Sequence, residues 1–213
     1  MNPRSGVAIA WLTMVSFGMA APDVFAQTPQ ALVERAEAAF EAQRFDDTVA
    51  LFDELVRLVP DAAPILWQRG IALYQLGRYR ECTAQFAAYF AVNDRDLENA
   101  TWHYLCAARA ESPARARATL LAAGPDPRIM RTQIYGMLRG DMTPEALVAL
   151  AETSVPVAEF YAYLYAGLYR EVAGDVPGAL AYLERAASDR YRDEGGFMNV
   201  VARVHVARLR TKK

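Results

Sequence analysis

A spacing of 34 residues recurs in the first half of the chain. Residues 32–61, LVERAEAAFEAQRFDDTVALFDELVRLVPD, align with residues 66–95, LWQRGIALYQLGRYRECTAQFAAYFAVNDR, so that small and large apolar positions coincide. Ala36 aligns with Gly70, and Thr48 aligns with Cys82. Apolar residues spaced three and four apart on either side of a short turn are typical of paired amphipathic helices. A repeat of this length predicts helix pairs stacked along the chain, and therefore an all-α fold.

Two glycines in the second repeat have different predicted roles. Gly70 lies inside a helix, where the absence of a side chain lets a second helix approach closely, and Gly77 lies in the turn between the helices. The same order of residues returns at 160–187, FYAYLYAGLYREVAGDVPGALAYLERAA, with Gly167 inside a helix and Gly174 in the turn. We therefore predict that this C-terminal segment forms a further repeat.

The whole chain can be divided on this pattern, and no alternating strand pattern competes with it. We predict clear repeats at about 30–63, 64–97 and 157–189, a degenerate unit at about 100–123, non-repeat helices at about 126–152 and a closing helix at about 196–210. The result would be one right-handed helical solenoid over residues 27–213, with roughly ten or eleven helices.

Four segments carry a resemblance to a known family: WQRGIALYQLGRY, TWHYLCAARA, DPRIM and YAYLYAGLYREV. They resemble tetratricopeptide-repeat (TPR) proteins, and within them a bacterial and plastid group of unassigned role. RGIALYQLGR and YAGLYREVAGD are more weakly similar to the outer-membrane TPR lipoprotein that acts as an adaptor for cell-wall hydrolases. The resemblance implies binding of a protein or peptide in a concave groove. Residues 1–26 contain no cysteine that could carry a lipid, which departs from the lipoprotein pattern.

The N-terminal residues have the pattern of a secretory signal peptide. Arg4 precedes an apolar run from Val7 to Ala21, and Val24-Phe25-Ala26 supplies small residues at a cleavage site. We predict a signal peptide at 1–26 and a mature protein that is exported, in a bacterium to the periplasm, without a stable membrane anchor. The alternative interpretation is an uncleaved anchor helix.

Composition and motifs exclude several classes of function. The net charge of −2 and a pI of about 5.8 provide no basic field for nucleic acid. The chain contains no phosphate-binding loop, no nucleophile elbow and no zinc-protease motif. The spacing of Cys82, Cys106, His103 and His205 does not match a zinc finger. We therefore expect no catalytic site, no metal and no cofactor.

Cys82 and Cys106 are the only cysteines in the chain. Both occupy small packing positions of successive units, where a buried thiol is unreactive. Export would permit a disulfide between them, but the sequence favours two free thiols.

In a TPR fold the concave wall comes from the first helix of each repeat, on the side away from its small residue. With Gly70 as that residue, the register gives these predicted partner-binding residues: Trp67, Ile71, Tyr74, His103, Tyr161, Leu164 and Tyr165. Core packing remains the alternative interpretation for Trp67 and for the tyrosines. His205 is expected to be a core histidine.

The leading functional hypothesis is a non-catalytic adaptor that binds a protein or peptide partner in this groove. A structural or assembly subunit of an envelope complex is the alternative. A third hypothesis, an enzyme that uses Arg128, His103 and tyrosines on a carbohydrate or phosphate, has no motif to support it.

Overall fold

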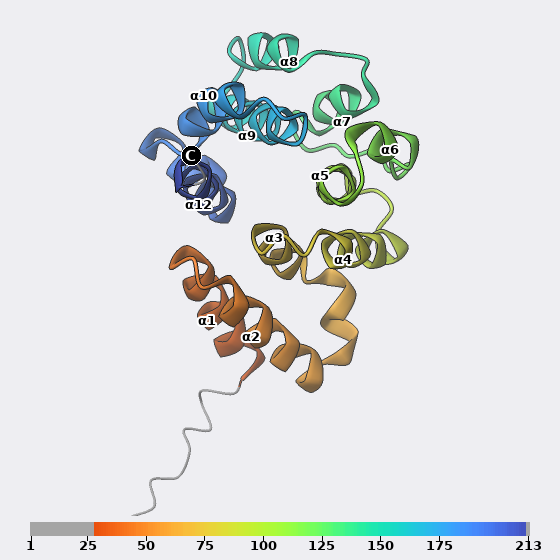
Figure 1. The fold of residues 1–213 in the computed structure, drawn as a ribbon, viewed down its shortest axis with the longest axis vertical. Coiled ribbons are helices and arrows are strands. Elements are labelled where there is room, and N and C mark those ends of the chain that lie inside the picture. The colour runs from red at the N-terminus through yellow and green to blue at the C-terminus, as the bar shows by residue number, and fades with distance from the viewer. Residues whose placement is uncertain (1–27, 212–213) are drawn as a thin grey trace, which may run out of the picture.

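A computed structural model describes residues 28–211, and within that range the chain consists of helices and their connections, without strands. The chain curves back on itself, so that the C-terminal helix α12 lies beside the N-terminal helix α1 (Figure 1). The predicted signal peptide at 1–26 lies outside the described residues.

The helices follow one another with short connections. Their bounds are α1 (Pro29–Glu41), α2 (Phe45–Leu58), η2 (Pro60–Ile65), α3 (Trp67–Gln75), α4 (Tyr79–Val92), α5 (Leu97–Ala110), α6 (Pro113–Ala118), α7 (Arg131–Arg139), α8 (Pro144–Ala151), α9 (Pro156–Val172), α10 (Val176–Ala186), η3 (Asp189–Tyr191), α11 (Arg192–Gly195) and α12 (Phe197–Thr211). The all-α prediction is confirmed for the described residues, and a helix close to the predicted 196–210 closes the chain.

Three helical hairpins, α1–α2, α3–α4 and α9–α10, share one turn. The left-handed residue of each turn is Gln43 (φ 59°), Gly77 (φ 75°) or Gly174 (φ 86°). In the first hairpin the Gln43 amide donates to the Phe40 carbonyl and the next amide donates to Ala39, both at 2.9 Å. The equivalent bonds close the other two turns, which makes all three the Schellman motif that ends many helices. The predicted turns at Gly77 and Gly174 are confirmed.

The second helix of two hairpins packs directly over a glycine of the first. A Cβ added to Gly70 would lie 2.6 Å from the Phe86 ring of α4, and one added to Gly167 would lie 2.6 Å from Leu183 Cγ of α10. Real side chains do not tolerate such distances, so glycine is required for this close approach. The predicted role of these two glycines is confirmed.

The middle of the chain departs from the predicted pattern. The helix that we expected to start at about residue 126 begins only at Arg131. Asp126 Oδ2 accepts a hydrogen bond of 3.1 Å from the Leu97 amide, which ties the 119–130 segment to the start of α5. Its Oδ1 accepts from the Arg128 amide, but Met130 then adopts a left-handed φ of 65°, so the helix starts only after Met130. Helix α7 ends at Arg139, before the left-handed Gly140, and Thr143 caps α8.

The prediction of two free thiols is wrong. Cys82 on α4 and Cys106 on α5 form a disulfide, with their Cα atoms 5.7 Å apart. Because α4 and α5 pack side by side, the small positions of successive units face each other within bonding reach.

Among residues 28–211, no helix is both long enough and apolar enough to cross a lipid bilayer.

A seam between three helices with a pocket at one end

The C-terminal helix α12 covers the face that we predicted to be an open wall. Its main packing partner is α10, and its side chains also contact α9 and α3. We call the contact between α3, α9 and α12 the seam. Ile71 and Tyr74 on α3 and Leu164 on α9 have no exposed surface. This corrects the expectation for these three residues, which lie in the core instead of lining an open groove.

One end of the seam is sealed by a buried polar cluster, which we call the closed end: Tyr74, Gln75, Glu171, His205 and Arg208. Glu171 of α9 lies at its centre, 2.6 Å from His205 Nε2 and 3.0 Å from Arg208 Nη2 of α12. The Tyr74 hydroxyl of α3 donates to the same carboxylate at 3.1 Å. The single cluster therefore ties all three helices of the seam together. The expectation that His205 is a core histidine is confirmed.

The protonation states at the closed end follow from the hydrogen-bond partners. Gln75 Nε2 can only donate, so His205 Nδ1 accepts at 3.0 Å and His205 Nε2–H donates to Glu171. Burial lowers the pKa of His205, although the adjacent Glu171 carboxylate opposes that shift. Burial alone would raise the pKa of Glu171, but His205 and Arg208 hold it down at about 2. Arg208 thus balances the Glu171 charge, and His205 stays neutral.

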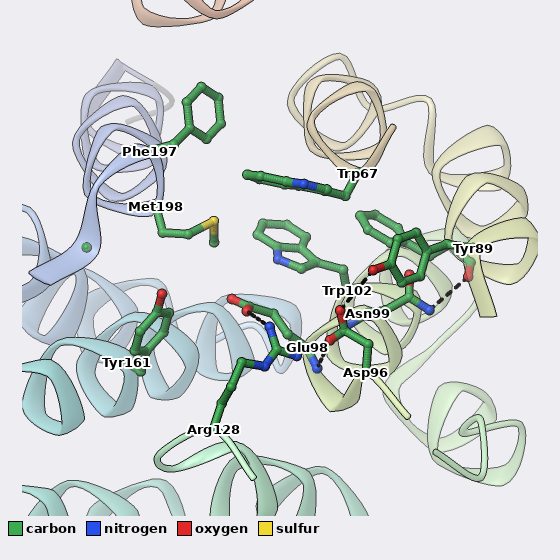
Figure 2. Close-up of a pocket in the computed structure, with 12 residues that line it drawn as sticks. Trp67, Tyr89, Asp96, Glu98, Asn99, Trp102, Arg128, Tyr161, Phe197 and Met198 are labelled. Carbon is green, nitrogen blue, oxygen red and sulfur yellow. Dashed lines mark hydrogen bonds and ion pairs between the residues drawn. The ribbon is translucent and has the colours of Figure 1, made fainter. Parts of the chain in front are cut away.

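The other end of the seam is open and contains a pocket of about 390 Å³, which we call the open end (Figure 2). Six aromatic residues line it: Trp67, Phe86, Tyr89, Trp102, Tyr161 and Phe197. The remaining lining residues are Asp96, Glu98, Asn99, Arg128, Gly195 and Met198. The size and the predominantly aromatic lining match ligand pockets, which typically span about 300–1,000 Å³.

Three of the helices that line the pocket begin beside it. Trp67 is the first residue of α3, Phe197 is the first residue of α12, and Glu98 lies in the first turn of α5. The Trp67 and Phe197 rings meet edge to face with centroids 5.5 Å apart, across the seam. Two segments 130 residues apart therefore build one aromatic wall.

Arg128 forms the polar floor of the pocket. It lies in the 119–130 segment, pairs with Asp96 and contacts Asp126 at 2.5 Å and Glu98 at 3.3 Å. Asp96 also accepts from the amides of Glu98 and Asn99, so this carboxylate caps α5. The hydrogen bond with Asp126 is the main reason that the pKa of Arg128 is raised. Every charge of the floor is thus already paired within the protein.

Glu98 connects the floor to α9. It lies 2.8 Å from Arg131 Nη2 and accepts from the Tyr165 hydroxyl. Burial first, and the Glu98 charge second, raise the pKa of Tyr165, which therefore keeps its proton. The Arg131 guanidinium lies 3.7 Å from the centre of the Tyr161 ring, a close cation–π contact. Tyr161 is thereby held in place on one wall.

The structure divides the predicted partner-binding residues into two sets. Trp67 and Tyr161 line the pocket, whereas Ile71, Tyr74, Leu164, His103 and Tyr165 are buried and are not among its lining residues. Sequence reasoning missed Trp102, Glu98, Arg128 and Phe197. Trp102 lies in the TWHYLCAARA segment and Arg128 in the DPRIM segment, but Arg128 was named only for the enzyme hypothesis. Glu98 and Phe197 had no signal, and they reach the pocket through the start of α5 and the return of α12.

The pocket lining provides ring faces, paired charges, a thioether and an amide. The twelve described residues that line it include no serine, threonine, cysteine, lysine or histidine. Within residues 28–211 no three His, Cys, Asp or Glu side chains gather to hold a metal ion.

Comparisons with known proteins leave the function to be argued from this geometry. No protein-family model matches the chain. No curated protein matches it either.

Proposed function

We propose that this protein is a non-catalytic, exported adaptor of the TPR type that binds a protein or peptide partner at the open end of the seam. The TPR assignment is supported by the 34-residue spacing and by hairpins that share one turn and one glycine packing position. Export is supported by Arg4, the apolar run and Val24-Phe25-Ala26. On this proposal the mature chain begins at Gln27, which intact-mass measurement of the exported protein would test.

One observation carries the binding proposal: an aromatic pocket remains at one end of a seam that is otherwise packed and sealed. Trp67 and Phe197 stay partly exposed there, although Tyr74, the other aromatic residue of α3, is completely buried. A partly exposed tryptophan in a concave site is typical of an anchor position for a partner. The pocket is large enough for one side chain of a partner segment and its flanking backbone.

The position of the pocket distinguishes the proposed binding site from an ordinary TPR groove. Because Ile71, Tyr74 and Leu164 have no exposed surface, an extended peptide would not have access to them. The partner would instead insert a residue between α3, α5 and the start of α12. Recognition would therefore be concentrated at one anchor rather than spread along several repeats.

Selection from a library of displayed random peptides, followed by affinity measurement, tests the proposal. Trp67→Ala should weaken binding of the selected peptides by roughly 2 kcal/mol or more, about 30-fold. Phe90→Ala is the matched control, because Phe90 is a partly buried aromatic residue on α4 that does not line the pocket. The control should bind like the parent protein.

Two results would contradict the proposal. One is that selected peptides bind Trp67→Ala and the parent equally well. The other is that the purified protein forms stable oligomers in which the pocket is covered, as expected for an assembly subunit.

A further inference from the structure

Two buried polar atoms in the pocket wall have no hydrogen-bond partner among residues 28–211. They are the indole nitrogen of Trp102 and the amide oxygen of Asn99, in side chains that belong to residues 2% and 4% exposed. The orientation of Asn99 is set by its NH₂ group, which donates to the Phe86 carbonyl at 3.0 Å. The wall therefore holds one unused donor and one unused acceptor. Buried polar groups are usually paired, so an unpaired donor that points into a pocket is available to a ligand.

The two atoms belong to one face of α5. Asn99 and Trp102 are three residues apart in the same helix, and side chains with that spacing are neighbours. Figure 2 shows the Trp102 indole nitrogen on the side of its ring that faces Glu98 and Met198, toward the interior of the pocket. The Met198 side chain beside it is unbranched and adaptable, so it can make room for an incoming group. A hydroxyl placed beside the indole nitrogen on this side would accept from Trp102.

The rest of the lining requires that this hydroxyl be carried by an apolar ring. Trp67, Tyr161 and Phe197 present aromatic surface around the space, and aromatic rings pack on them edge to face or offset. A saccharide would need polar partners around its whole rim, whereas the unused groups here lie on a single wall.

The charges of the pocket favour a neutral ligand. Its charged lining residues, Asp96, Glu98 and Arg128, sum to −1, and Arg128 is already paired with carboxylates. A phosphorylated or carboxylate-bearing group would meet net repulsion. A cationic group could not accept the Trp102 hydrogen bond.

From these observations we infer that the pocket holds a tyrosine side chain of the partner segment. The ring lies among Trp67, Tyr161 and Phe197, and its hydroxyl accepts a hydrogen bond from the Trp102 indole nitrogen. This inference rests on the proposed function and names the residue that the proposed site recognises.

N-acetyl-tyrosine amide and N-acetyl-phenylalanine amide are suitable probes, because they are neutral and differ only in the hydroxyl. Titrations of ¹⁵N-labelled protein, followed at the indole signals of Trp67 and Trp102, should give at least tenfold tighter binding of the tyrosine probe. The O-methyl derivative of the tyrosine probe places a methyl group beside the buried Trp102 nitrogen and should bind more weakly than the parent probe.

Trp102→Phe removes the donor while keeping an aromatic ring. The tenfold preference should fall to near unity in this variant. Both probes are measured on the same folded protein, so a general loss of affinity cancels in the ratio. If this variant does not fold, the three probes on the parent protein decide the question alone.

Equal binding of the tyrosine and phenylalanine probes to the parent protein would overturn the inference and leave the proposed function intact. Preferential binding of methyl glucoside over both probes would also overturn it, in favour of a saccharide ligand. Failure of the proposed function is a separate result, in which library-selected peptides are insensitive to Trp67→Ala.

Discussion

The two ends of the seam use the same three helices for opposite purposes. At the closed end, α3, α9 and α12 meet through Tyr74, Glu171 and His205, all of them buried. At the open end, about two turns away along α3, the same helices contribute Trp67, Tyr161 and Phe197 around a pocket. Helix packing alone therefore does not decide where a binding site forms. The side chains at each level decide whether the helices are joined or kept apart.

The two ends of the seam also differ in how their charged side chains are paired. The closed end buries one carboxylate against one guanidinium and a neutral imidazole, in side chains of residues that are at most 8% exposed. The open end pairs its charges in the floor and leaves aromatic surface around a pocket. We conclude that the closed end fixes the position of α12 and that the open end uses this position for binding.

The largest expected effect comes from breaking the closed end. Glu171→Ala leaves Arg208 and His205 buried without their carboxylate and should destabilise the fold by about 3–5 kcal/mol. Glu184→Ala is the matched control, because Glu184 forms an exposed pair with Arg210 and should lose at most about 1 kcal/mol. Urea unfolding measures both. Equal stability of the two variants would show that the cluster does not hold α12.

The disulfide tests the comparison on the side of the pocket that α4 and α5 form. Cys82 and Cys106 join α4 to α5, the two helices that carry Phe86, Tyr89 and Trp102. The bond closes a loop over a separation of 24 residues, so its loss in Cys82→Ser/Cys106→Ser should cost roughly 3 kcal/mol. Differential unfolding with and without reductant gives the value. Peptide mapping under non-reducing conditions that finds both cysteines free would contradict this account.

Acid should act on the closed end first. The native state keeps His205 neutral because burial lowers its pKa, whereas the unfolded chain binds a proton near pH 6.5. Stability from this residue is therefore complete above pH 6.5 and declines below it, by at most about 1.4 kcal/mol per pH unit. Glu171 adds a second loss between about pH 4.5, its ordinary pKa, and its native pKa of about 2.

Charged side chains around His205 influence its pKa, and His103 is a second histidine that has to be tested separately. Arg208 and Arg109 face the cluster and disfavour a proton on His205, while Glu171 favours one. Burial also lowers the pKa of His103, outside the seam. His205→Gln and His103→Gln should each remove one part of the decline below pH 6.5. A stability profile unchanged by His205→Gln would contradict the assignment.

The smallest effect is expected at the open end. Trp67→Phe keeps an apolar ring but weakens the edge-to-face contact with Phe197, and should cost only about 0.5–1.5 kcal/mol of stability. Thermal unfolding tests this value. A collapse of the melting temperature would instead identify Trp67 as a core residue and leave the pocket without its proposed anchor.

The sequence predicts the hairpins well and the seam poorly, for a physical reason. The close contact of Gly70 and the turn at Gly77 depend on residues within one hairpin, so local spacing reveals them. The seam depends on pairs such as Gln75 and His205, which are 130 residues apart. No local repeat in the sequence indicates that α12 returns to contact α3 and α9.

The same reasoning explains the mixed outcome for the site. Trp67 and Tyr161 were found because a helix register places them near the start of α3 and α9. Ile71 and Leu164 share that register but lie deeper, where α12 covers them. Arg128 was missed as part of a binding pocket because it lies in a segment without helical periodicity, brought to α5 by Asp126.

Hydrogen–deuterium exchange of the protein with and without a library-selected peptide tests the central claim, that only the open end binds. The account predicts added protection at the starts of α3, α5 and α12, around residues 67–71, 97–102 and 197–201. The closed end around residues 171–175 and 205–209 should exchange equally slowly in both samples. Protection confined to the closed end, or to α1 and α2, with the pocket segments unchanged, would contradict it.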